Sequence, residues 1–352
     1  MQTTEFFNTQ LKANSLLLAL FLWATAPALS AQTTVVPNPG QDQPQPAQQA
    51  PQQPQVQSPA TVPGDSPQAG TASATPWLEK LGRAVSELEY SGLVTFEHAG
   101  MLETLRVVHA VRDGQQVERV RYLSGDPREL VSHGVTRACE GAAGPFNRAA
   151  LLSAAGQERL QQAYQFILRG EERIADRPTV VIEARPRDRH RLGMLVNLDR
   201  ETGLPLRSML IGPQGKVLER YQFVELDLAP VKDSDLQPQS GSARRIDNST
   251  PCIAAQTRWR MGWLPNGYRP VAVQTLTDGD MLVFSDGLSV FTVFVQRLGP
   301  ELNFQGKAIR GATVAYMDQV EADGINYTVT VVGEIPDSTA QLLARAVTTT
   351  GG

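Results

Sequence analysis

Residue types that commonly carry catalytic or metal chemistry are few and scattered in this sequence. It has four histidines: His98, His109, His133 and His190. None forms a His-x-x-x-His or His-Glu-x-x-His arrangement, the spacings that hold zinc on one helix face. There is no Gly-x-Ser-x-Gly nucleophile elbow, and Asp278-Gly279-Asp280 lacks the later ligands of a calcium loop, which favours a hairpin turn. We therefore predict that the protein is not an enzyme and uses no metal or other cofactor.

The densest basic run, residues 185–191, is a stronger candidate for binding. It contains Arg185, Arg187, Arg189 and Arg191. Guanidinium groups bind phosphates and carboxylates through paired hydrogen bonds, so this run could hold lipid phosphates or acidic side chains of a partner. The alternative is a solvated hairpin tip that Asp188 partly neutralises. The sequence leaves both interpretations open.

The first thirty residues have the layout of a cleavable secretory signal. Lys12 precedes an apolar run, 16–26, and small residues follow at Ala28, Ser30 and Ala31. The run is shorter than the roughly 20 apolar residues that a membrane-spanning helix needs. We predict a signal peptide over residues 1–31 and an exported protein.

The segment that follows, residues 32–75, is built mainly from Gln, Pro, Ala, Ser, Thr and Gly, with Asp42 and Asp65 as its only charges. It buries too little apolar surface to offset the entropy of ordering its backbone, so we predict a disordered tether. The tether could give the folded part reach towards a surface, or it could be a spacer without a partner of its own.

The chain has two cysteines, Cys139 and Cys252. Disulfides persist in oxidising compartments outside the cytoplasm, and an even number in an exported protein favours a bond between the two. That bond would join the first folded domain to the start of the second. Two buried free thiols are the alternative.

The rest of the chain is long enough for two domains. We place a first domain at residues 76–230, a polar linker at 231–251 and a smaller domain at 252–352. The formal net charge of −4 and the isoelectric point near 5.7 argue against a nucleic-acid partner, which requires clustered positive charge.

The sequence of the first domain predicts an α+β fold. A helix is predicted from Thr75-Pro76 as its cap, with Gly92 as its stop, and a second helix over 149–168. Alternating apolar residues and short turns predict a strand meander at four places: 179–184, 193–198, 206–211 and 217–226. Such a meander predicts a curved antiparallel sheet or unclosed barrel with the helices covering it.

A curved sheet under helices can enclose an apolar cavity for an acyl chain. The residues that could line the cavity, or belong to an ordinary core, are Val94, Phe96, Leu105, Val107, Val196 and Met209.

The sequence of the smaller domain predicts an antiparallel β fold with a closing helix. A hairpin is predicted around Ser285-Asp286-Gly287, further strands at 312–317 and 327–332, and a helix over 336–347. The aromatic residues Trp259, Trp263 and Tyr268 could contact a partner in a groove between the domains, because aromatic side chains anchor interfaces. Packing the domain's own core is the alternative role for each of them.

Five strings then indicate a family. In chain order they are ERIADRP (172–178), LDRETGLP (198–205), WLPNGY (263–268), SDGL (285–288) and VVGEIP (331–336). Together they resemble the MucB/RseB family, periplasmic regulators of the envelope-stress sigma factor, over nearly all of the folded part.

This resemblance implies that the first domain is similar in fold to the lipoprotein carriers LolA and LolB. It implies a periplasmic protein that binds the periplasmic domain of a single-span anti-sigma factor of the MucA/RseA kind and shields it from site-1 protease. It also implies release by acyl chains or lipopolysaccharide. A periplasmic lipid or lipoprotein carrier is the alternative function, and the second domain favours the regulator. The sequence leaves a homo-oligomer open.

Overall fold

The computed structural model describes residues 74–134, 154–241, 243–247, 256–297 and 305–350. The chain divides into two compact units, Met1–Trp23 with Thr71–Gly352, and Ala24–Gly70; every described residue belongs to the first. The predicted signal peptide, nearly all of the tether, Cys139 and Cys252 lie outside the described residues. Within the described ranges, no helix is long and apolar enough to cross a membrane.

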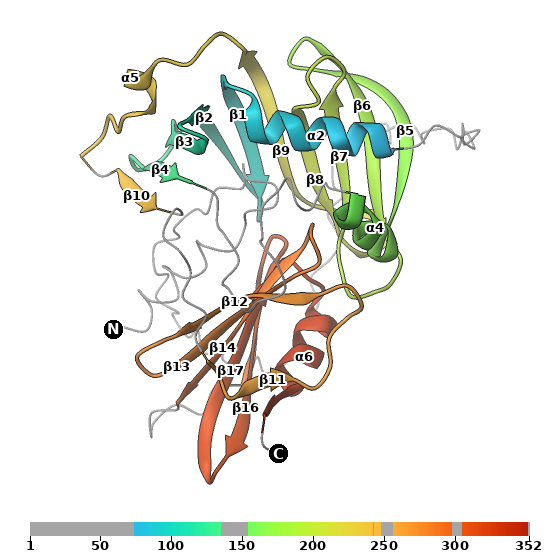
Figure 1. The fold of residues 1–352 in the computed structure, drawn as a ribbon, viewed down its shortest axis with the longest axis vertical. Coiled ribbons are helices and arrows are strands. Elements are labelled where there is room, and N and C mark those ends of the chain that lie inside the picture. The colour runs from blue at the N-terminus through green and yellow to red at the C-terminus, as the bar shows by residue number, and fades with distance from the viewer. Residues whose placement is uncertain (1–73, 135–153, 242, 248–255, 298–304, 351–352) are drawn as a thin grey trace, which may run out of the picture. The chain divides into compact units, whose positions relative to one another are not determined.

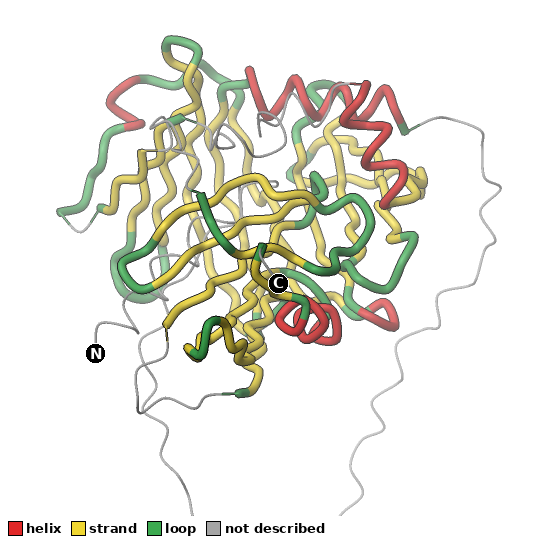
Figure 2. Tube along the Cα trace, turned by 60° about the horizontal axis from the view of Figure 1, so that its bottom comes forward, coloured by secondary structure: helices red, strands yellow, loops and turns green. Residues whose placement is uncertain are grey.

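The described chain is mostly β, with short helices outside the strands (Figures 1 and 2). The elements of the first, larger sheet and of its helices are α2 (Thr75–Glu87), β1 (Tyr90–His98), β2 (Met101–Arg112), β3 (Gln115–Tyr122), β4 (Glu129–His133), α4 (Ala154–Ala163), β5 (Tyr164–Ile174), β6 (Arg177–Pro186), β7 (Gly193–Asp199), β8 (Pro205–Ile211), a 3-10 turn (Pro213–Gly215), β9 (Val217–Asp227), α5 (Asp233–Leu236) and β10 (Arg244–Asp247). The remaining elements are β11 (Trp259–Met261), β12 (Arg269–Thr275), β13 (Gly279–Ser285), β14 (Val290–Arg297), β15 (Gly306–Arg310), β16 (Thr313–Ala322), β17 (Ile325–Gly333), α6 (Asp337–Arg345) and β18 (Val347–Thr349).

The larger sheet has ten strands in the order β10-β4-β3-β2-β1-β9-β8-β7-β6-β5. The predicted meander is confirmed as β6 to β9, each strand antiparallel to the next. The prediction of a purely antiparallel sheet is wrong, because β10 pairs with β4 in parallel. The α+β class is likewise replaced by a mostly β architecture with a mixed sheet.

The strand β10 lies inside the segment predicted as a polar linker, and buried charges attach the preceding residues to the same sheet. Arg119 donates to Glu129 at 2.5 Å and to the carbonyl oxygen of Asp235 at 2.8 Å. Glu129 also accepts hydrogen bonds from the backbone N–H groups of Gln239 and Ser240. Polar composition therefore does not keep this segment away from the sheet, because its backbone groups satisfy a buried ion pair.

Helix α2 begins and ends earlier than the sequence predicts. Ala74, not Thr75, is the N-cap residue, and no side chain caps the helix. The helix ends at Glu87, so Gly92 is not its stop but a residue of β1. The apolar face of α2 packs on the larger sheet, where Trp77 and Leu81 contact the buried cluster of β6 and β7.

The helix predicted over 149–168 is only partly right. Residues 149–153 lie outside the described ranges, α4 covers Ala154–Ala163, and β5 begins at Tyr164. From Tyr164 onward the apolar residues Phe166 and Leu168 follow at every second position and pack into the same clusters as β6 and β7. That alternation suits a strand, and pairing with β6 decides the outcome.

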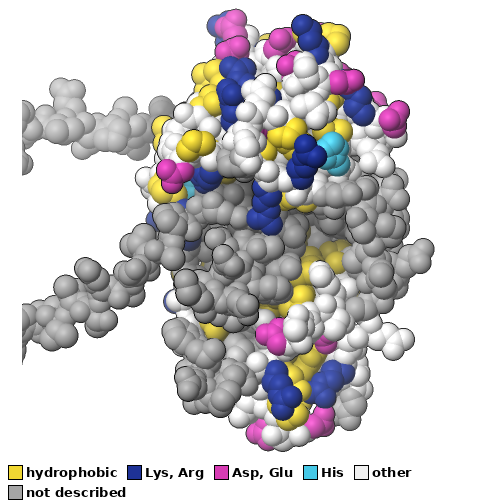
Figure 3. All heavy atoms as spheres, turned by 90° about the vertical axis from the view of Figure 1, so that its left-hand side faces the viewer, with side chains coloured by type: hydrophobic (Ala, Val, Ile, Leu, Met, Phe, Trp, Pro, Cys, Tyr) yellow, Lys and Arg dark blue, Asp and Glu magenta, His cyan; other side chains and the backbone are white. Residues whose placement is uncertain are grey.

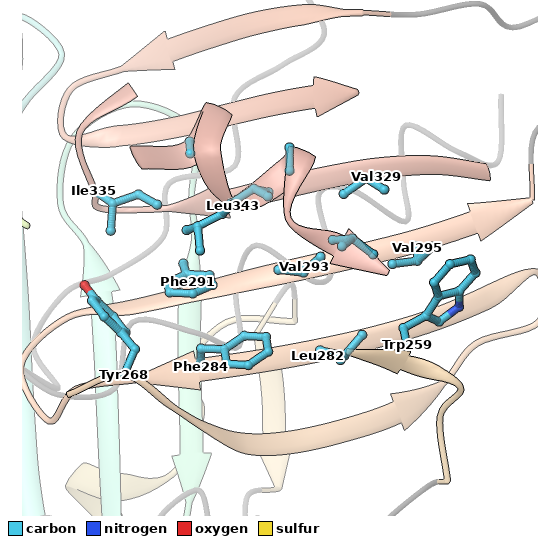
Figure 4. Close-up of a cluster of buried hydrophobic side chains, with 14 of the residues drawn as sticks. Trp259, Tyr268, Leu282, Phe284, Phe291, Val293, Val295, Val329, Ile335 and Leu343 are labelled. Atoms are coloured by element: carbon cyan, nitrogen blue, oxygen red, sulfur yellow. The ribbon is translucent and has the colours of Figure 1, made fainter. Parts of the chain in front are cut away.

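The second sheet has six antiparallel strands in the order β12-β13-β14-β17-β16-β15, and α6 packs against its buried cluster. The predicted hairpin is confirmed as β13 and β14, and the closing helix as α6. Figure 4 shows Phe284, Phe291, Val293 and Val329 of the strands in one buried cluster with Leu343 of α6. Burying such large apolar side chains stabilises the domain by about 1.5–3 kcal/mol for each.

Candidate functional site

A buried ion pair joins the two sheets. Nη1 of Arg191, in the turn between β6 and β7, donates to Oδ2 of Asp286 in the turn between β13 and β14 at 2.7 Å. Both side chains have zero exposure. Nη2 of Arg191 donates to the carbonyl oxygen of Asn266 at 2.6 Å, so one guanidinium group contacts two separate loops of the second sheet.

The environment of this pair satisfies nearly every polar atom. Asp286 also accepts hydrogen bonds from the Tyr164 hydroxyl at 3.1 Å and from the backbone N–H groups of Leu288 and Ser289. Burial raises the pKa of Asp286, and Arg191 opposes that rise. Burial also raises the pKa of Tyr164 well above its usual value. We therefore assign the cluster a structural role: it fixes the basic turn of the first sheet against the second.

Further contacts extend this junction along the same turn. His190 shares a hydrogen bond of 3.2 Å with the hydroxyl of Thr339 in α6. Its ring also packs edge-on against Trp263, with the centroids 5.1 Å apart. The Arg191 guanidinium also lies over the Tyr268 ring, 5.0 Å from its centroid. The structure thus brings the basic run together with two of the three predicted aromatic residues.

The three aromatic candidates have different surroundings. Trp259 and Tyr268 are buried in the core of the second sheet, the alternative role that the sequence left open (Figure 4). Trp263 is 37% exposed, so it remains available to a partner.

The four arginines of the basic run also differ in their exposure and in their partners. Arg191 is buried in the ion pair, so its guanidinium is not free for a partner. Arg185 is exposed and bonds Glu183 at 2.9 Å, while Arg187 donates to the carbonyl oxygen of Gln161 in α4. Arg189 is exposed and makes no hydrogen bond or ion pair with any residue that the structure describes.

A groove of about 970 Å³ lies beside this turn, on the face of the larger sheet opposite α2. Its floor is apolar and comprises Val181, Leu195, Met209 and Ile211. Its charged rim comprises Arg169, Arg185, Arg189, Arg207, Glu172, Glu183 and Asp188, and the first turn of α6 at Pro336, Asp337 and Ser338 forms part of its wall. The larger sheet and helix α6 of the second domain therefore contribute to one surface.

The six residues proposed for an acyl-chain cavity do not share one site. Val94, Phe96, Leu105 and Val107 are buried together in one hydrophobic cluster on the face that α2 covers. Val196 packs against neighbouring clusters on that face. Met209 pairs in register with Leu195 and lies in the groove on the other face, so it cannot line a cavity with the other five.

Charges of both signs occupy the described surface (Figure 3). Among the described residues, no group of three or more His, Cys, Asp or Glu side chains could hold a metal ion. On the face drawn in Figure 3, Lys and Arg side chains stand among Asp and Glu over the described residues. That face offers no continuous positive field of the kind that nucleic acids require.

Sequence comparisons give this arrangement a family. Residues 73–240 match the MucB/RseB N-terminal domain, and residues 254–348 match the MucB/RseB C-terminal domain. The sigma factor AlgU regulatory protein MucB of Pseudomonas aeruginosa is 33% identical over 301 residues, which cover 80% of this chain and 92% of that protein. The sigma-E factor regulatory protein RseB of Escherichia coli K12 is 28% identical over 306 residues, covering 79% and 93%.

A solved structure of a family member is also similar to this chain. The crystal structure of MucB in complex with MucA(peri) has 31% sequence identity to this chain and a TM-score of 0.64, covering 79% of this chain and 99% of that one. Both named relatives are regulatory proteins of sigma factors. The chain therefore belongs to the MucB/RseB family of sigma-factor regulatory proteins.

Proposed function

We propose that this protein is a periplasmic negative regulator that binds the periplasmic domain of a single-span anti-sigma factor and shields it from site-1 protease. The observation that carries the proposal is the groove formed by the larger sheet and the first turn of α6, in a chain whose relative was crystallised with MucA(peri). Both domains contribute, because neither sheet alone supplies the floor, the basic rim and the α6 wall.

The chemistry of the groove suits an extended segment with apolar and acidic side chains. Val181, Leu195, Met209 and Ile211 form a floor on which apolar side chains can be buried. Arg189 has no described partner of its own, so its guanidinium is available for a carboxylate. Trp263, whose ring packs edge-on against His190, adds an exposed aromatic contact near the same turn.

The anti-sigma segment is shielded from the protease because it occupies the groove. A segment held in the groove is withdrawn from a protease that must bind its substrate in an extended form. A disordered segment that orders on binding can cover a large surface at modest affinity, which keeps the complex reversible. We propose acyl chains or lipopolysaccharide as the releasing signal, on the family resemblance. Arg185 and Arg189 at the rim are placed to bind the phosphates of lipopolysaccharide.

Charge reversal at the rim tests the proposed seat. We expect Arg189→Glu to weaken binding of the cognate anti-sigma periplasmic domain about tenfold, mainly through slower association at low salt. Arg260→Glu is the matched control, because Arg260 is an exposed arginine on β11 outside the groove. Surface plasmon resonance at two salt concentrations measures both variants. Equal loss of affinity in the two variants would place the partner elsewhere.

A further inference from the structure

A second polar contact between the two domains involves neither Arg191 nor Asp286. The turn between β15 and β16 places the backbone N–H of Ala312 3.1 Å from Oε1 of Glu219 on β9. Ala312 is 2% exposed and packs among apolar residues of the first domain, including Leu160 of α4 and Leu210 of β8. The hairpin tip of the second sheet is therefore seated in the core of the first.

The fit around this carboxyl group is close. Gly311 has a φ of +60°, and a β-carbon there would lie 2.8 Å from Oε1 of Glu219 and 3.3 Å from the backbone nitrogen of Ala99. A glycine satisfies both the left-handed backbone and the approach of the turn. The turn thus contacts β9 and the β1–β2 connection at once.

We propose that the β15–β16 turn is a detachable clasp between the two sheets, closed over the Glu219 carboxyl group and held most firmly when that group is protonated. When the clasp is open, Glu219 returns to water. When it is closed, the same carboxyl group is buried with one backbone N–H as its described donor. A neutral carboxyl group still accepts that bond through its carbonyl oxygen, so protonation removes the buried charge without removing the contact.

The charges around Glu219 favour protonation of its carboxyl group when the clasp is closed. Burial raises the pKa of Glu219 to about 7, and the Ala312 N–H and the charge of Arg310 only partly oppose it. His98 on β1 is the register partner of Glu219, but its ring is bonded to Glu103 on β2. Leu210, the register partner on β8, is apolar. Arg310 is exposed to solvent, which screens its charge.

The sign of the effect follows from proton linkage. The closed clasp has the higher pKa, so its stability is greatest below about pH 4.5, the ordinary value, and is lost as the pH rises through about 7. The ratio of closed to open turn should fall about tenfold between pH 6 and pH 8. The Arg191–Asp286 junction holds the sheets together throughout, so the clasp alone opens.

Hydrogen–deuterium exchange on the mature, full-length protein tests the clasp and requires no partner. After correction for intrinsic exchange rates, we expect protection of the Ala312 amide to fall about tenfold from pH 6 to pH 8. Glu219→Gln keeps an acceptor oxygen and has no charge, so its protection should be high and independent of pH. Glu97→Gln, an exposed carboxylate on neighbouring β1, should keep the wild-type dependence.

Exchange of the wild-type protein over a series of pH values tests the pH dependence of the clasp without any variant. Protection of Ala312 that is equal at pH 6 and pH 8 would overturn the proposal. So would a Glu219→Gln variant that retains the wild-type slope, because the titrating group would then be another residue.

Discussion

Arg191 and Asp286 form a fully buried ion pair although 95 positions separate them in the sequence. Each lies in a turn, one between strands of the first sheet and one between strands of the second. Removing one charge from such a pair leaves the other uncompensated in a medium of low polarity, which destabilises a protein more than the pair itself stabilises it. The junction is therefore sensitive to the loss of either charge.

Loss of one member of this pair should have a large effect on stability. We expect Arg191→Met to lower the free energy of unfolding by about 3–5 kcal/mol, because Asp286 would remain buried without its counter-ion. Urea denaturation followed by tryptophan fluorescence measures the change. Arg173→Met is the control, because Arg173 and its partner Asp176 have 70% and 85% exposed side chains and the expected change is below about 1 kcal/mol. Similar values for both variants would show that the junction does not hold the sheets.

The backbone around Gly92 leaves too little room for a β-carbon. A β-carbon there would lie 2.3 Å from the carbonyl oxygen of Glu225, where the register of β1 and β9 shifts. We expect Gly92→Ala to lower the melting temperature by several degrees, equivalent to about 1–3 kcal/mol of overpacking. Gly193→Ala on β7 is the matched control, because its β-carbon would meet neighbours at ordinary distances of 3.5–3.6 Å. An unchanged melting temperature for Gly92→Ala would contradict the close approach.

The strands were more predictable from the sequence than the site. Alternation and turn residues revealed β6 to β9, because these strands bury one face in the hydrophobic clusters to which α2 and α4 contribute. The strand β10 gave no such signal, because Arg244–Asp247 is an edge strand of mostly polar residues. Asp286 was visible only as a turn residue, and nothing local indicates its partner Arg191. A charged residue inside a tight turn between two apolar strands was the one available signal of a buried ion pair.

The cysteine pair remains a prediction, because Cys139 and Cys252 lie outside the described residues. If they are bonded, the closed loop is long and the bond should contribute about 3–5 kcal/mol by the chain-entropy argument. Thiol titration of the unfolded, unreduced protein should find no free thiol, and reduction should lower the melting temperature. Two titratable thiols before reduction would rule the bond out.

Acyl-chain binding in the first domain is also a prediction. If the face under α2 accepts an acyl chain, native mass spectrometry of the mature protein with micromolar fatty acid should show a one-to-one complex. Met209→Ala should leave that complex unchanged, because Met209 lies on the opposite face in the groove. No complex at micromolar lipid would contradict the cavity.

Protection of the anti-sigma factor is the most direct test of the regulatory role. The assay measures cleavage of the cognate anti-sigma periplasmic domain by its site-1 protease, with and without saturating mature protein. We predict that wild-type protein slows cleavage strongly, that Arg260→Glu does so equally, and that Arg189→Glu requires about tenfold more protein for the same effect. A cleavage rate unchanged by saturating wild-type protein would contradict the regulator and favour the lipid or lipoprotein carrier in its place.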